Sequence, residues 1–218
     1  MNLFNKNQLR IFSLLGILGG LVLFAGDMLL YYNGNHENLL ENMAQVSGNR
    51  IIYSGIAALI STWLYIFGLI PVYYAFSPAS LRVRNTVLLT FAGILIAYGV
   101  VHGAFIAIAT DARLAAQHQL DLNESVALAR QTNDAIRLFI YPLFAVLSVV
   151  FIYNVLKNNT LYQKWIVLFF PLLPFLLHGF VGNVLSGKSL VIINGGFYNL
   201  IVIVFFTASA ISLWNKYE

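Results

Sequence analysis

The sequence contains no cysteine, which excludes thiol chemistry, disulfide bonds and cysteine-ligated metal sites. Charged residues are also scarce, at 9% of the 218 residues, whereas a soluble domain of this size carries about a quarter. The net charge is +4, but no basic stripe with interleaved aromatic residues is present, so no nucleic-acid partner is predicted. The chain is instead rich in apolar residues, which make up 60% of it.

Long apolar runs dominate the sequence. A helix needs about 20 apolar residues to cross the hydrocarbon core of a membrane, and runs of this length recur along the chain without the alternating pattern of a membrane barrel. We therefore predict an all-α, polytopic membrane protein, in which residues 1–218 form a single domain, a bundle of six transmembrane helices. The predicted spans are Ile11–Tyr32, Ile51–Phe76, Asn85–Ala109, Asp134–Leu156, Leu161–Leu185 and Leu190–Trp214.

Basic residues in the short loops orient the predicted bundle. Cytoplasmic loops of membrane proteins carry an excess of lysine and arginine. The loops after the second and fourth predicted spans contain only basic charges, namely Arg82, Arg84 and Lys157. We therefore predict that both termini are cytoplasmic.

The first of two longer loops on the outer side is Asn33–Arg50. Within it, Leu39, Met43 and Val46 share one face of a helix. A short amphipathic helix of this kind buries its apolar face at the membrane surface or against the bundle. We predict that residues 33–50 form a mobile lid over the outer mouth of the bundle.

The second outer loop, residues 110–133, is predicted to be helical and solvated. Its charges are of both signs, as is usual for a wet surface. Asp121 and Glu124 have the spacing of a capping box, so a helix is predicted to begin there and to run towards the fourth span.

An acidic residue, Asp27, interrupts the apolar stretch LVLFAGDMLLYY at residues 21–32. An aspartate near the centre of a span costs about 2.5–3.5 kcal/mol on insertion, so it is expected to have a partner inside the bundle. Glycines allow helices in membranes to pack closely, and Asp27 shares its helical stripe with two of them. At about 100° per residue, the stripe contains Gly16, Gly20, Leu23, Asp27 and Tyr31.

Other predicted spans carry polar residues at a similar depth. His102 and His178 lie near the outer ends of the third and fifth spans. We therefore predict a polar pocket in the outer leaflet, in which Asp27, His102 and His178 are the catalytic or metal-binding residues. The residues predicted to line it are Ser54, Tyr98, Arg137, Tyr141, Asn194 and Tyr198.

The first interpretation of this pocket is an intramembrane hydrolase that acts on lipid. A histidine oriented by Asp27 could act as a general base towards an ester or phosphodiester. Alternatively, Asp27, His102 and His178 could hold zinc with an open position for water. Ser54 is the best-placed hydroxyl nucleophile, although no GxSxG motif surrounds it.

Two further interpretations stay open. The pocket could bind a lipid, a quinone or a haem without catalysis, with His102 and His178 as haem ligands and Arg137 facing a phosphate or carboxylate headgroup. The polar residues could also form a purely structural cluster, because hydrogen bonds between helices are common in membranes. Whether the protein is an enzyme is therefore left open, and membrane lipid is its expected partner.

Three stretches carry a resemblance to a known family. These are GGLVLFAGDMLLYY at residues 19–32, HGAF at residues 102–105 and GGFYNL at residues 195–200. Together they resemble an uncharacterised family of bacterial multi-span integral membrane proteins with no assigned activity. The resemblance implies a multi-pass protein of the bacterial cytoplasmic (inner) membrane and implies no catalytic residue.

Overall fold

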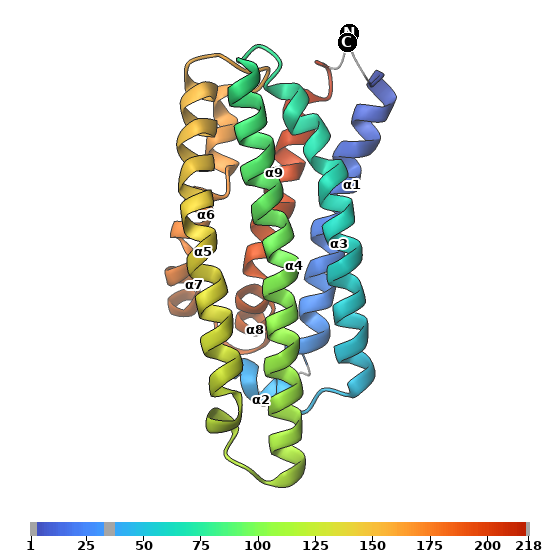
Figure 1. Cartoon of the computed structure of the whole chain (residues 1–218), viewed down its shortest axis with the longest axis vertical. Helices are drawn as coiled ribbons and strands as arrows, with labels where there is room; N and C mark the ends of the chain where they lie inside the picture. The colour runs from blue at the N-terminus through green and yellow to red at the C-terminus, as the bar shows by residue number, and fades with distance from the viewer. Residues whose placement is uncertain (1–3, 33–37, 217–218) are drawn as a thin grey trace.

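The computed structural model describes residues 4–32 and 38–216, which form helices and connecting segments without a strand. Within these ranges four helices are long and apolar enough to cross a membrane, and a fifth is counted if the bent pair α8 (Gly187–Gly195) and α9 (Phe197–Leu213) forms one span. The all-α prediction is confirmed, and the long apolar helices indicate a multi-pass membrane protein (Figure 1). The four long helices are α1 (Lys6–Tyr31), α3 (Gly48–Ala75), α4 (Leu81–His118) and α5 (Leu122–Leu156).

Each long helix begins at a polar residue that caps it. The side chains of Asn5, Ser47, Ser80 and Asp121 accept hydrogen bonds from backbone N–H groups in the first turns of α1, α3, α4 and α5. These N–H groups have no partner within the helix itself. The caps therefore set where the helices start, while the apolar runs set how far they continue.

The predicted fifth span, Leu161–Leu185, is not one helix. The chain there forms the 3-10 helix η1 (Lys164–Phe169), then α6 (Leu172–Leu176) and α7 (His178–Val184). Pro171 and Pro174 explain the break between η1 and α6, because proline lacks a backbone N–H and its ring clashes with the preceding turn. The described residues therefore contain four spanning helices, or five with the bent pair, where six were predicted.

The segment predicted as an outer helical loop, residues 110–133, consists of the ends of α4 and α5. The two helices continue past their predicted limits and meet at a tight turn, in which Gln119 has a φ of 56°. Asp121 then caps α5, and its Oδ1 accepts a hydrogen bond from the backbone N–H of Glu124 at 2.8 Å. The result is a long helical hairpin that extends beyond α1 and α3 (Figure 1).

The described part of the predicted lid contains the short helix α2 (Leu39–Ala44). Met43 and Val46 are buried, and Leu39 packs against the same apolar cluster. Arg113 on α4 donates a hydrogen bond to the Val46 carbonyl at 2.9 Å, which holds the end of this segment. Residues 33–37 of the predicted lid lie outside the described residues, and movement of the lid stays a prediction.

Helices α1 and α3 pack closely through small residues. A Cβ atom added to Gly68 would lie 2.5 Å from the Cα of Gly16, so the two backbones are in contact there. Further along the pair, Ser61 and Ser54 donate hydrogen bonds, each at 2.8 Å, to the carbonyls of Gly19 and Gly26. This packing places Ser54 beside Asp27, the next residue after Gly26.

The first turns of α1 and the last turn of α9 lie at the same end of the bundle (Figure 1). Arg10 joins them, because it donates a hydrogen bond to the Trp214 carbonyl at 3.1 Å and its guanidinium lies over the Trp214 ring. The Gln119–Asp121 turn lies at the opposite end. Which end faces the cytoplasm stays a prediction.

That orientation can be measured with reporter fusions. We expect alkaline phosphatase, which is active only outside the cytoplasm, to be inactive when fused after Glu218 and active when inserted after Gln119. A green fluorescent protein at the same two positions should give the reverse pattern, because it folds in the cytoplasm. An active phosphatase after Glu218 would overturn the predicted orientation.

Candidate functional site

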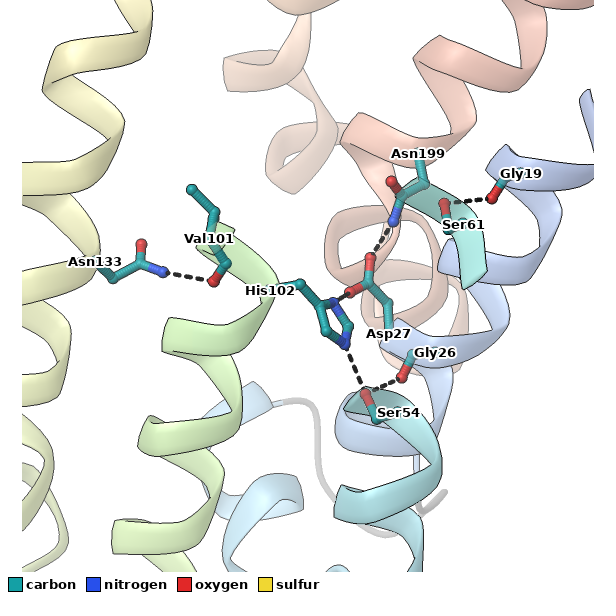
Figure 2. Close-up of polar contacts among 9 residues, drawn as sticks. All are labelled: Gly19, Gly26, Asp27, Ser54, Ser61, Val101, His102, Asn133 and Asn199. Carbon is teal, nitrogen blue, oxygen red and sulfur yellow. Dashed lines mark hydrogen bonds and ion pairs between the residues drawn. The ribbon is translucent and has the colours of Figure 1, made fainter. Parts of the chain in front are cut away.

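Three helices bring polar side chains together around Asp27 (Figure 2). Its Oδ1 lies 3.0 Å from Nδ1 of His102 on α4, and its Oδ2 accepts a hydrogen bond from Nδ2 of Asn199 on α9 at 2.5 Å. All three residues are buried. Asp27 therefore has the partner inside the bundle that its position in an apolar helix requires.

The second ring nitrogen of His102 continues the chain of contacts (Figure 2). Its Nε2 lies 2.7 Å from Oγ of Ser54, and that hydroxyl donates to the Gly26 carbonyl at 2.8 Å. Both ring nitrogens of His102 are thus bonded within the protein. The result is a linear network from Asp27 through His102 and Ser54 to the backbone of α1.

Asp27, His102 and Ser54 are connected in the same order as the triad of a serine hydrolase. Ser54, however, is not accessible to a substrate. Ser54 is 0% exposed and is absent from the cavity lining, unlike Asp27 and His102. The hydrogen of its hydroxyl group is donated to the Gly26 carbonyl of α1. It does not point into the cavity where a substrate would bind. Ser54 therefore lies behind His102, and the structure does not present it as a nucleophile.

A cavity of about 250 Å³ opens beside the network, between α1, α4, α5 and the α6–α9 segments. Its walls are apolar and aromatic, with Phe105, Phe144 and Phe175 among them. Of the residues predicted to line the pocket, all but Ser54 lie around this cavity, together with the three predicted catalytic residues. Those lining residues are Tyr98, Arg137, Tyr141, Asn194 and Tyr198.

His178 lies on the same cavity but not with Asp27 and His102. Its Nε2 is 3.0 Å from Oδ1 of Asn194, and its ring packs on Phe197 and Tyr198. Among the residues that the structure describes, no group of three or more histidine, cysteine, aspartate or glutamate side chains could hold a metal ion. The predicted zinc set of Asp27, His102 and His178 is therefore not assembled.

The predicted haem ligation meets a related difficulty. His102 has no unbonded ring nitrogen to offer an iron atom, because Asp27 and Ser54 occupy both. His178 shares its Nε2 with Asn194. To bind a haem iron from both sides, His102 would have to lose a contact to Asp27 or Ser54, and His178 would have to lose its contact to Asn194 or use its other nitrogen.

Asn199 was not predicted to be a site residue. A continuous helix over residues 190–214 places Asn194 and Tyr198 on the inner stripe and turns Asn199 away from it. The helix is instead broken between α8 and α9 with a bend of 65°, and the break rotates Asn199 towards Asp27. The sequence did contain a sign of this break, the glycine pair Gly195–Gly196, since glycine pairs are common sites of sharp kinks in helices.

Close packing maintains this break. A Cβ atom on Gly195 would lie 2.9 Å from the ring of Tyr31, and one on Gly196 would lie 2.3 Å from the ring of Phe24. The two glycines therefore allow the start of α9 to approach α1 beside Asp27.

No curated protein and no solved structure matches the chain. The model of a family of unknown function, DUF6796, matches residues 4–216, so the chain belongs to that family, as its resemblance to an uncharacterised family predicted.

Proposed function

We propose that this membrane protein binds an amphipathic small molecule, a lipid or lipid-like compound, in the cavity beside Asp27. The observation that carries the proposal is the composition of that cavity, in which a buried hydrogen-bonded network meets apolar and aromatic walls. Ligand sites commonly combine mainly apolar walls with a few fixed polar groups. In this proposal the cavity lies in the outer leaflet of a bacterial cytoplasmic membrane.

Asp27 is a polar group of the cavity wall that can accept a hydrogen bond from the occupant. A carboxylate offers about four lone-pair sites, and His102 and Asn199 use one on each oxygen. Because Asp27 also lines the cavity, it has acceptor capacity left for a hydroxyl or amine of a ligand. His102 and Asn199, on two other helices, hold the carboxyl group in a fixed position.

Binding is favoured over lipid hydrolysis by the same geometry. Ser54 is inaccessible, and both nitrogens of His102 are bonded to other protein groups. A hydrolase would therefore have to activate water through Asp27 or His178, without an accessible serine nucleophile. We keep hydrolysis as an outcome that the binding experiment can detect.

The proposal predicts that filling the cavity abolishes binding. Ile140 on α5 lines the cavity, whereas Leu138, two residues away, is 64% exposed and does not. We expect native mass spectrometry of the purified protein with monoolein, oleate or dioleoylphosphatidylglycerol to show one bound molecule for at least one of them. Ile140→Trp should weaken that binding at least tenfold, and Leu138→Trp should leave it unchanged.

The contrary results are equally clear. Equal retention of the probe by Ile140→Trp and the parent would place binding elsewhere, and no binding of any probe would refute the proposal. If oleate is released from monoolein at a rate that Asp27→Asn abolishes, the protein is a hydrolase and not a binding protein.

A further inference from the structure

We infer that the polar group of the occupant is an anion held by Arg137, so that the ligand is an amphiphile with a carboxylate or phosphate group. This inference rests on the proposed binding function and names its ligand class. Three features support it: the net charge of the Asp27–His102 pair, the surroundings of Arg137 and a second cavity that adjoins the first.

The charge of the pair follows from counting hydrogens along the network. The single hydrogen of the Ser54 hydroxyl is donated to the Gly26 carbonyl, so the hydrogen in the Ser54–His102 contact belongs to Nε2 of His102. The 3.0 Å contact between Nδ1 and Asp27 needs one more hydrogen, on either the nitrogen or the oxygen. In the first case the two charges cancel, and in the second both groups are neutral, so the pair carries no net charge.

Arg137 is therefore a positive charge on the cavity wall that the pair does not neutralise. Arginine stays protonated in proteins, and Arg137 forms no salt bridge among the described residues, although Asp27 and Asp134 line the two cavities that it borders. His178 can add positive charge to the lining but never negative charge. An anionic ligand would supply the missing countercharge.

The setting of Arg137 suits recognition of such an anion. Its guanidinium carbon lies 5.1 Å from the ring centre of Phe105 and 5.4 Å from that of Tyr198. Aromatic contacts of this kind stabilise a guanidinium while its N–H groups remain able to bond. The planar fork of N–H groups matches the oxygens of a carboxylate or phosphate.

A second cavity provides a route for the anion. It has a volume of about 270 Å³, lies between α2, α4 and α5, and shares Arg137, Tyr31, Leu39 and Phe105 with the first cavity. Arg130 and Asp134, which lie one turn apart on α5, also line it. Arg137 thus lies where the two cavities meet, and the second cavity carries more charged side chains than the first.

The test compares two probes with the same hydrocarbon tail, one of which ends in a carboxylate and the other in an uncharged hydroxyl group. We expect the parent protein to bind oleate at least tenfold more tightly than oleyl alcohol, as measured by native mass spectrometry or calorimetry in the same neutral detergent. Arg137→Gln should weaken oleate binding at least tenfold and leave oleyl alcohol unchanged. Arg82→Gln is the matched control, because it also removes one arginine charge, but from the first turn of α4, away from the cavity. It should alter neither the affinity for oleate nor that for oleyl alcohol.

The outcomes separate the inference from the proposed function. Equal affinities of the parent for oleate and oleyl alcohol would overturn the anion inference and leave the binding function intact, whereas no binding of either probe or of monoolein would refute both. Retained binding of oleyl alcohol by Arg137→Gln shows that this variant is folded. Oleoyl lysophosphatidate in place of oleate then shows whether the anion is a phosphate, and a preference for it that Arg137→Gln removes supports the inference equally.

Discussion

Replacing His102 with alanine is expected to lower the free energy of unfolding by about 3–5 kcal/mol when Asp27 and His102 are both ionised, since that is the usual cost of removing one partner from a buried ion pair. The substitution removes the contact to Oδ1 of Asp27 and the contact to Ser54. Asp27 would keep only Asn199 as a side-chain partner. The measurement is reversible denaturation in mixed micelles.

Two further variants make this prediction specific. His178→Ala removes the other cavity histidine, which is only partly buried and shares one side-chain hydrogen bond with Asn194, so we expect a loss of about 1 kcal/mol. Asp27→Asn combined with His102→Ala should be more stable than His102→Ala alone, because the unpaired carboxyl group is gone. A loss for His102→Ala as small as the loss of about 1 kcal/mol expected for His178→Ala would show that the Asp27 network contributes little to stability.

Substituting Gly68 with alanine is expected to destabilise the α1–α3 pair by about 1–3 kcal/mol, the usual cost of overpacking. The new Cβ atom would lie 2.5 Å from Cα and 3.1 Å from the backbone nitrogen of Gly16. Backbone atoms cannot rotate away as a flexible side chain can, so the helices must separate. Their separation would also stretch the hydrogen bonds from Ser54 and Ser61 to α1.

Gly103 on α4 provides the matched control, because a Cβ atom there would meet nothing within 4 Å. Gly103→Ala should therefore be neutral or stabilising by up to about 1 kcal/mol, as alanine is the better helix former. Thermal unfolding of both variants in one detergent measures the difference. A Gly68→Ala protein as stable as the Gly103→Ala protein would contradict the close approach of α1 and α3.

The meeting of Asp27 with His102 was predictable from the sequence. An aspartate in a long apolar run needs a partner, and His102 lies at a similar depth on another long helix. Both α1 and α4 are continuous through these positions, so the regular rise of 1.5 Å per residue relates position in the sequence to depth in the bundle.

The same reasoning failed for the last third of the chain. Hydropathy is averaged over a window, so Pro171 and Pro174 did not interrupt the apolar run 161–185, although they break the helix. Once the helix is broken, the depth of a residue in the bundle and the direction of its side chain no longer follow from its spacing in the sequence. His178 therefore contacts Asn194 and not Asp27, while Asn199, placed on the wrong face by a continuous helix, contacts Asp27 instead.

The spacing of residues in the sequence also could not show whether a buried side chain is accessible from a cavity. It placed Ser54 on the inner face of its helix, and Ser54 is indeed buried, at 0% exposure. Whether a buried hydroxyl faces a cavity or a neighbouring backbone depends on the helix packed against it. Here the small residue Gly26 lets α1 come close enough for its carbonyl to accept the Ser54 hydrogen.

The long hairpin of α4 and α5 relates the cavity to the thickness of a bilayer. With 35 residues, α5 is about 52 Å long, which exceeds a hydrocarbon core of about 30 Å by roughly 22 Å. The excess lies at the end with the Gln119–Asp121 turn, where α1 and α3 stop short (Figure 1). Arg137 lies about 22 Å along α5 from its first residue, so a hydrocarbon core that began where this excess ends would place Arg137 at the boundary between lipid headgroups and acyl chains.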